Sequence, residues 1–364
     1  MENQDLFKRL GGKLSFYSLD EKASRKLEEI LKIVFTPDEA ELALDLSFAV
    51  TDIEDIAGTV GKKAEELIPR LEKMADKGLV YFGKKDGQRK YQLLPLVPGI
   101  IELQFMGEKP PVSGPGQLKL AKLFEEFFEQ MGLSQFLFRA KTPYTRVIAV
   151  ESQVGPQSAI QPYEAISRYI RETKDLAIGN CYCRTEKRIL GKACSAPVDV
   201  CMVFGPFARF TVERGFAKAA NESQMLKALD RAEEAGLVHV VDNIQEKINF
   251  TCNCCGCCCG FLQGINRFQV PNAVAFSRFQ ATLDSKACTG CGVCVGRCQV
   301  KAIKESGKKV KIDAKKCLGC GACVSTCPAE AISLSERKGF RAPVSNLTEL
   351  RMTILQEQQA AAAK

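Results

Sequence analysis

The sequence is poor in histidine and has no long apolar run, and each absence argues against a class of protein. His239 is the single histidine among 364 residues, which include 18 cysteines. Metal sites that mix cysteine and histidine, as in many zinc domains, are therefore disfavoured, and thiolate ligands are expected. No apolar stretch approaches the length of a membrane span, and residues 1–20 lack the apolar core of a signal peptide. We expect a cytoplasmic protein whose free thiols bind metal instead of forming disulfides.

Two further absences concern catalysis. The sequence contains no Gly-x-Gly-x-x-Gly nucleotide fingerprint and no catalytic His/Asp pair. His239 lies among Leu237, Val238 and Val240, a setting typical of a strand residue rather than a ligand. These observations favour an electron carrier or a subunit of a redox enzyme over an autonomous enzyme, and no catalytic residue is assigned.

A cysteine pattern is written twice near the C-terminus. Cys288, Cys291, Cys294 and Cys298 form C-x2-C-x2-C-x3-C, and Cys317, Cys320, Cys323 and Cys327 repeat it before Pro328. This is the spacing of bacterial ferredoxins, in which each run gives three thiolates to one [4Fe–4S] cluster and its fourth thiolate to the other. The pattern predicts one cluster on Cys288, Cys291, Cys294 and Cys327, and a second on Cys317, Cys320, Cys323 and Cys298.

Residues 284–335 as a whole resemble the 2[4Fe–4S] bacterial ferredoxin domain. The dipeptides Ala302-Ile303 and Ala331-Ile332 recur at the same offset from the cysteines in both halves. The segment departs from the family at Gln299, where proline is usual, so the packing beside the second cluster is expected to differ. The resemblance implies a ferredoxin-like fold that transfers electrons at low potential.

Ten more cysteines lie in the middle of the chain. The first group is Cys181, Cys183, Cys194 and Cys201, and the second is Cys252, Cys254, Cys255, Cys257, Cys258 and Cys259. So many reactive thiols without a role would be a chemical liability, so a metal-binding purpose is expected. Within the second group, Cys252, Cys255 and Cys258 repeat the C-x2-C-x2-C spacing of a cluster-binding loop, and a thiol of the first group could supply the fourth ligand.

Several arrangements of these thiols remain open. The first group could hold its own cluster, or both groups could converge on one larger or linked cluster. A zinc tetrathiolate on Cys181, Cys183, Cys194 and Cys201 is less favoured. Arg184 follows the C-x-C directly and could donate to cluster sulfur or a small anion, although an ordinary surface arginine is the favoured interpretation.

The N-terminal part has a different pattern. Apolar residues at helical spacing follow Ser24, the segment 36–39 combines an N-cap, a proline and a capping-box glutamate, and a helix carrying Leu67 and Leu71 ends at Gly78. Two short β-rich segments, 80–82 and 91–94, follow as a hairpin. Helices followed by a hairpin in this order resemble a winged-helix domain. Acidic and basic residues balance on the would-be recognition helix, which argues against DNA binding and for a protein-contact or structural role.

The chain is too long for a single core, so a multidomain α+β protein is expected. We predict a winged-helix-like domain with an N-terminal arm (1–106), a central mixed α/β cysteine-rich domain (117–280), a 2[4Fe–4S] ferredoxin-like domain (281–340) and a helical tail (341–364). The segment from Lys286 to Arg341 contains twelve basic and four acidic residues, and this excess of eight equals the net charge of the chain, +8. This excess either offsets the negative clusters or forms a docking face for an acidic redox partner.

The combination of these segments is similar to multi-cluster iron–sulfur proteins of anaerobes with an N-terminal winged helix. The predicted function is electron relay through two [4Fe–4S] clusters, to or from a further cysteine-ligated cluster, and a redox partner. One alternative is a reductase whose central cluster is the substrate site. A second is a regulator that binds DNA and senses redox state. The donor, the acceptor and the oligomeric state are not encoded in these patterns.

Overall fold

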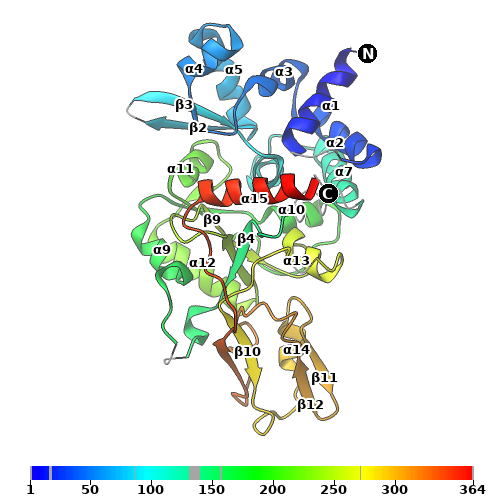
Figure 1. Cartoon of the computed structure of the whole chain (residues 1–364), viewed down its shortest axis with the longest axis vertical. Helices are drawn as coiled ribbons and strands as arrows, with labels where there is room; N and C mark the ends of the chain where they lie inside the picture. Colours follow the sequence, from blue (N-terminus) through cyan, green and yellow to red (C-terminus); the bar gives the residue numbers. More distant parts are fainter. Residues whose placement is uncertain are drawn as a thin grey trace. The chain divides into compact units, whose positions relative to one another are not determined.

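The computed structural model describes residues 2–15, 19–85, 87–130, 140–155, 158–270 and 272–362 (Figure 1). The chain divides into two compact units. Unit 1 contains Met1–Leu137, Thr185–Ala193 and Arg209–Lys218, and unit 2 contains Phe138–Arg184, Cys194–Ala208 and Ala219–Lys364. This division differs from the four consecutive segments expected from the sequence, because two stretches of the central region return to unit 1. All 18 cysteines belong to unit 2.

Unit 1 is mainly helical. Its elements are α1 (Glu2–Ser15), α2 (Glu21–Val34), α3 (Pro37–Asp45), β1 (Thr51–Asp52), α4 (Ile53–Val60), α5 (Ala64–Asp76), β2 (Val80–Lys85), β3 (Gln88–Leu93), an irregular turn (Leu96–Ile100), α6 (Ile101–Met106) and α7 (Pro115–Glu129). The capping box is present: the Thr36 hydroxyl accepts from the Glu39 N–H, and the Glu39 carboxylate accepts from the Thr36 N–H. The expected helices and hairpin are found, with strands in the order β1-β3-β2.

Unit 2 is built on a six-stranded sheet with the order β4-β8-β9-β6-β5-β7. The strands are β4 (Thr145–Ile148), β5 (Leu176–Gly179), β6 (Cys201–Phe204), β7 (Lys218–Ala219), β8 (Val238–Asp242) and β9 (Phe250–Cys254). Its helices are α9 (Ile166–Glu172), α12 (Glu222–Glu234) and α13 (Gly260–Asn266), with short 3-10 turns at Glu151–Gln153 and Pro162–Glu164. Helices α10 (Tyr182–Ile189) and α11 (Gly205–Glu213) begin in unit 2 and continue into unit 1. The mixed α/β character expected of the central region is therefore present.

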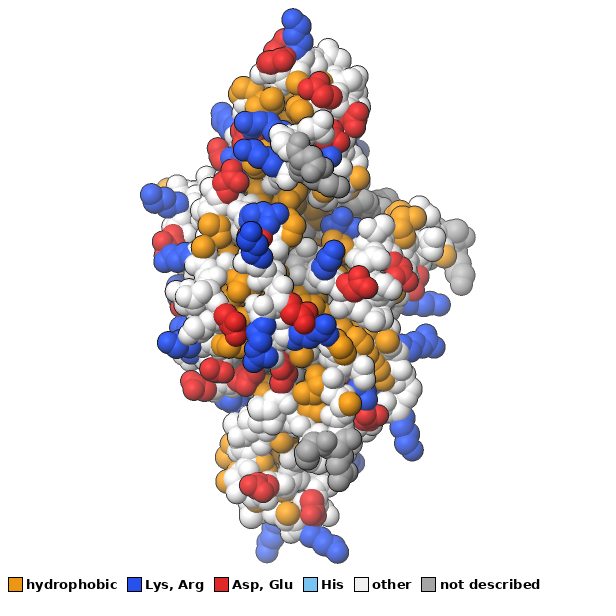
Figure 2. Space-filling model, turned by 90° about the vertical axis from the view of Figure 1, so that its left-hand side faces the viewer, with side chains coloured by type: hydrophobic (Ala, Val, Ile, Leu, Met, Phe, Trp, Pro, Cys, Tyr) orange, Lys and Arg blue, Asp and Glu red, His pale blue; other side chains and the backbone are white. Residues whose placement is uncertain are grey.

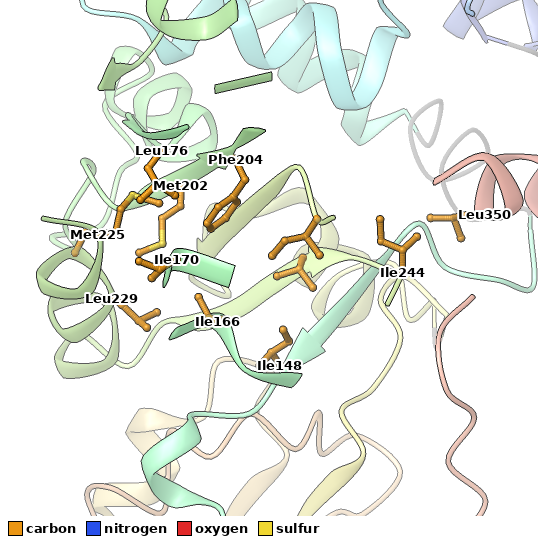
Figure 3. Packing of buried hydrophobic residues seen from close by; sticks show 13 residues of the cluster. Ile148, Ile166, Ile170, Leu176, Met202, Phe204, Met225, Leu229, Ile244 and Leu350 are labelled. Atoms are coloured by element: carbon orange, nitrogen blue, oxygen red, sulfur yellow. The ribbon is translucent and has the colours of Figure 1, made fainter. Parts of the chain in front are cut away.

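The two faces of this sheet carry different side chains. Successive residues of a strand point to opposite faces, and Met202 pairs with Thr251 while Val240 pairs with Cys252. One face packs Ile148, Met202 and Phe204 against residues of α9 and α12 (Figure 3). The opposite face presents Cys201, Cys252 and Cys254. The sheet thus separates an apolar core from a face that is lined with thiols.

The C-terminal module, residues 279–336, combines two antiparallel strand pairs. Strand β10 (Phe279–Leu283) pairs with β13 (Ile332–Glu336), and β11 (Ile303–Ser306) forms a hairpin with β12 (Lys309–Ile312). Helix α14 (Val293–Arg297) lies between β10 and the hairpin in the sequence, and these elements lie together in Figure 1. The two cysteine runs therefore occupy corresponding places in a repeated unit.

The expected helical tail is helix α15 (Leu347–Ala362). It is more than a frayed end, because Leu350 is completely buried within the apolar core of unit 2. Among the described residues, no helix combines the length and the apolar character that crossing a membrane requires.

Candidate metal centres

The C-terminal module brings its eight thiols together in two sets. Burial raises the pKa of Cys294, and the charges of Cys291, Cys327 and Cys288 raise it further. Cys323 is placed in the same way near Cys320, Cys317 and Cys298. Each set contains three cysteines of one run and the last cysteine of the other.

The second set surrounds a cavity. Its wall contains the four thiol-bearing residues together with neighbouring small and apolar ones: Val238, Ala281, Cys298, Gln299, Val300, Ala302, Ile303, Cys317, Leu318, Gly319, Cys320, Gly321, Ala322 and Cys323. Gly319 allows this loop to approach β10, because a Cβ there would lie 1.8 Å from the Phe279 carbonyl oxygen. Four convergent cysteines around one walled space are a donor set that fits a [4Fe–4S] cluster.

Backbone N–H groups are aimed at the sulfur atoms of the module. The N–H of Ala302 donates to Cys298 Sγ at 3.2 Å, and the N–H of Ala331 donates to Cys327 Sγ at 3.2 Å. These two alanines belong to the repeated Ala-Ile dipeptides, so the repeat has a physical role.

Gln299 connects the second set to the central cysteines. Its side-chain oxygen accepts from the Gly256 N–H at 2.8 Å, and its side-chain nitrogen donates to the Gly236 carbonyl at 3.0 Å. Asn266 Nδ2 donates to the carbonyl oxygens of Gln299, at 2.9 Å, and of Gly256, at 3.1 Å. A proline at position 299 would have no side-chain amide to make these contacts. The departure from the ferredoxin pattern was visible in the sequence, but its role was not.

Four central thiols converge on one point. All Sγ atoms of Cys194, Cys255, Cys257 and Cys258 lie within 4.8 Å of one another. The separation is 3.7 Å for Cys194–Cys255, 3.7 Å for Cys257–Cys258 and 4.0 Å for Cys194–Cys258. Four sulfurs bound to one tetrahedral ion at about 2.3 Å are about 3.8 Å apart. This four-thiol site therefore has the dimensions of a single-ion tetrathiolate.

The cluster-binding thiols provide an internal comparison. Among the described residues, no three thiols of the C-terminal module lie within 4.8 Å of one another. Each thiolate of a cubane binds a different iron, so a wider spacing is expected there. The four-thiol site and the ferredoxin-like sets thus differ in the kind of centre that they can hold.

The remaining six central cysteines form a separate group beside the four-thiol site. Interaction with Cys183 and Cys201 lowers the pKa of Cys181, and interaction with Cys201 and Cys254 lowers the pKa of Cys252, so these thiols are neighbours. Cys259 completes the circuit, because it interacts with both Cys183 and Cys254. We call this set the six-thiol ring.

The structure divides the expected C-x2-C-x2-C triad between these two sets. Cys255 and Cys258 join the four-thiol site, whereas Cys252 joins the ring. The reason is that Cys252 and Cys254 lie on β9, where alternate residues share a face, while Cys255 comes after the strand ends. Cys194 lies in the four-thiol site and not with Cys181, Cys183 and Cys201. The structure therefore does not bring together the four thiols of the zinc tetrathiolate that the sequence left open.

Arg184 lies between the two sulfur sets and is 1% exposed, so its interpretation as a surface arginine is wrong. One terminal nitrogen donates to the Asn253 carbonyl at 2.9 Å and contacts Cys255 Sγ at 3.7 Å. Burial acts to lower the pKa of Arg184, but the charges of Cys181, Cys201 and Cys255 raise it above its usual value. Its Nε and its other terminal nitrogen have no hydrogen-bond partner in the described part of the chain.

His239 is confirmed as a strand residue with satisfied hydrogen bonds. It lies on β8 and is 1% exposed. Its Nδ1 is 2.6 Å from Asn253 Oδ1, and its Nε2 is 3.3 Å from a Glu233 carboxylate oxygen. Both ring nitrogens are therefore engaged on the face of the sheet that lies opposite the thiols.

Comparison with known proteins locates one module. Residues 280–328 match the family described as the 4Fe-4S dicluster domain. This match supports a C-terminal ferredoxin-like iron–sulfur domain and [4Fe–4S] binding. No curated protein and no solved structure matches the chain. The central thiols lie outside the matched segment, so only their own geometry indicates what they bind.

Proposed function

We propose that this chain is an iron–sulfur electron-transfer protein with two [4Fe–4S] clusters and a further metal centre. Cys288, Cys291, Cys294 and Cys327 would hold one cluster, and Cys317, Cys320, Cys323 and Cys298 the other. The further centre is an iron ion at the four-thiol site of Cys194, Cys255, Cys257 and Cys258. The observation that carries this proposal is the hydrogen bond from the Gly256 N–H to Gln299.

This hydrogen bond joins the ligand loops of two centres. Gln299 directly follows the cluster ligand Cys298, and Gly256 lies between Cys255 and Cys257. The connection between the two sites therefore consists of a few covalent bonds and one hydrogen bond of 2.8 Å. A contact this short supports electron exchange between the second cluster and the four-thiol site. It favours iron over zinc there, because Zn²⁺ has no redox chemistry.

The partner that we propose is a redox protein with an acidic docking face. The basic excess of the C-terminal module is exposed on and beside its hairpin, at Lys301, Lys304, Lys308, Lys311, Lys315 and Lys316. Figure 2 shows Lys and Arg side chains projecting from the lower end of the view. Complementary charge would speed the encounter of the two proteins.

For unit 1 we propose a winged-helix-like domain that contacts protein. Arg89 of the hairpin and Arg214 both pair with Glu72 of α5. Tyr91 also donates to Glu72, at 2.7 Å. Because these cations already have a carboxylate partner, they are poorly suited to neutralising phosphates, and a DNA-binding regulator is disfavoured.

The test is metal analysis and redox titration of protein purified without air. Two cubanes contribute about eight irons and eight inorganic sulfides per chain, and an iron ion at the four-thiol site adds iron without sulfide. We expect dithionite to reduce the clusters and the reduced protein to pass electrons to a one-electron acceptor. Cys291→Ser should remove the EPR signal of one cubane, and Cys255→Ser should remove one metal ion.

Three outcomes would contradict the proposal. A colourless folded protein would exclude the clusters. Zinc instead of iron at the four-thiol site would exclude its part in electron transfer while leaving the cubanes in place. Reduced clusters that exchange no electrons with any acceptor would exclude the carrier role.

A further inference from the structure

The six-thiol ring is a site in its own right. Cys181, Cys183, Cys254 and Cys259 are between 2% and 7% exposed, and Cys201 is 7% exposed. Cys252 keeps intermediate exposure, although β9 is an inner strand flanked by β8 and β6. Part of Cys252 is therefore accessible, within a surrounding of buried thiols.

Local structure explains why these thiols face one another. The register of β6 and β9 places Cys201 opposite Cys252 on the thiol-bearing face of the sheet. Cys254 follows Cys252 on the same face of β9. Cys181 directly precedes α10, Cys183 lies in its first turn, and Cys259 is the N-cap residue of α13. Six thiols thus arrive from four separate places in the chain.

The spacing of the ring excludes a single ion. Within the part of the chain that the structure describes, no three ring thiols lie within 4.8 Å of one another, in contrast to the four-thiol site. Neighbouring thiols interact around the circuit, while those further along it are too widely separated to share one tetrahedral ion. A centre that several of these thiols bind must therefore contain several metal ions.

Arg184 indicates that such a centre carries exposed acceptor atoms. The guanidinium is buried, interacts with the charges of Cys181 and Cys201, and has two nitrogens without a partner in the described residues. Buried polar groups of native proteins are nearly always hydrogen-bonded. Bridging sulfide ions of a cluster are acceptors that could satisfy the two donors, and the positive charge would offset part of the charge of the thiolates.

We propose that Cys181, Cys183, Cys201, Cys252, Cys254 and Cys259 hold a polynuclear iron–sulfur cluster of at least four irons, with Arg184 donating to its sulfide. This centre is distinct from the four-thiol site and from the two cubanes of the C-terminal module. It would add a buried electron store next to the proposed relay. Its existence does not depend on the electron-transfer role.

The first experiment measures acid-labile sulfide in the wild-type protein after anaerobic iron–sulfur reconstitution and desalting. The two cubanes account for about eight sulfides per chain, and the ring cluster raises the value to about twelve or more. A value near eight, with both ferredoxin-like EPR signals at full intensity, overturns the ring cluster and leaves the proposed function intact. Loss of one of the two ferredoxin-like signals in Cys291→Ser tests that function separately.

The second experiment locates the additional sulfide. The double variant Cys201→Ser/Cys254→Ser should lose at least four irons and four sulfides and keep the ferredoxin-like signals. Its matched control, Cys194→Ser, should lose one metal ion and no sulfide. If the ring variant keeps all its sulfide, or if the control loses the additional sulfide, the assignment is overturned.

A third variant decides the matter if the double variant does not fold. Arg184→Gln keeps every thiol and removes one buried positive charge, so it should lower the midpoint potential of the additional cluster and leave those of the cubanes unchanged. Arg184→Lys keeps the charge, so the midpoint potential of the additional cluster should remain close to the wild-type value. Unchanged potentials of all centres in Arg184→Gln would overturn the proposal.

Discussion

Gly256 approaches Gln299 so closely that a Cβ on the glycine would lie 2.0 Å from the Gln299 carbonyl oxygen. This backbone-to-backbone approach places the loop that carries Cys255, Cys257 and Cys258 against the residue that follows cluster ligand Cys298. Asn266 Nδ2 donates to the carbonyl oxygens of both Gly256 and Gln299. The cysteine-rich loop and the C-terminal module are therefore held together by a contact that tolerates no side chain at position 256.

Gly256→Ala should force these two segments apart. Because the atom in the way belongs to the backbone, the contact cannot be relieved by a change of rotamer, and we expect a loss of about 1–3 kcal/mol in the free energy of unfolding. Chemical denaturation under anaerobic conditions measures it. Gly296→Ala is the matched control, because a Cβ there meets no atom within 4 Å. Equal stability of the two variants would refute the tight approach.

Gln299→Leu tests the hydrogen bonds at the same contact. It leaves the Gly256 N–H and the Gly236 carbonyl without their partners, at a cost of about 1–3 kcal/mol for each buried group. Gln299→Glu keeps an acceptor for Gly256 and should lose less. Combined with Gly256→Ala, the leucine variant should destabilise by less than the sum of the two single changes, since both disrupt one contact. Strict additivity in denaturation experiments would argue that the contacts are independent.

The same residues show what the sequence could and could not predict. The grouping of the ferredoxin-like thiols is local, because a repeated loop carries three of every four ligands, and the spacing alone reveals it. Gln299 was recognised as a departure from the family pattern, but its partner Gly256 lies 43 residues away and only the folded chain brings the two together.

The sites to which the central cysteines belong are harder to predict from the sequence, for a related reason. The spacing of Cys252, Cys255 and Cys258 predicts a single cluster-binding loop, but the structure places Cys252 within strand β9. Strand alternation then sends Cys252 and Cys254 to one site, and the chain reversal after β9 sends Cys255 to another. The place of Cys201 in the ring likewise depends on the pairing of β6 with β9. Spacing in the sequence carries no information about such long-range pairing.

Cys258 and Cys259 are adjacent in the sequence and should respond differently to substitution. Cys258 belongs to the four-thiol site, whereas Cys259 interacts with the ring thiols Cys183 and Cys254. We therefore expect Cys258→Ser to lower the metal content by one ion without loss of sulfide. Cys259→Ser should lower both iron and sulfide. The same elemental and sulfide analysis serves both variants, and an identical loss in the two would mean that the central thiols form one site.

The stability of unit 1 should depend on pH through Glu186. This side chain is 3% exposed, and burial raises its pKa to about 7, although Lys187, at 3.2 Å, acts to lower it. A folded-state pKa above that of the unfolded chain favours the protonated folded form. The stabilisation is therefore complete below pH 4.5 and is lost as the pH rises through 7, by up to about 3 kcal/mol.

Glu186→Gln provides the measurement for this effect, because a neutral amide cannot ionise. Urea unfolding of the anaerobic protein between pH 6 and pH 8, within the range where the carboxyl ionises, should show stability falling in the wild type and a flatter profile in the variant. The variant should be the more stable protein at pH 8, where the wild type contains a buried charge. Parallel profiles would show that Glu186 stays ionised in the folded protein, held by Lys187 and the neighbouring Lys192 that shares Glu125 with it.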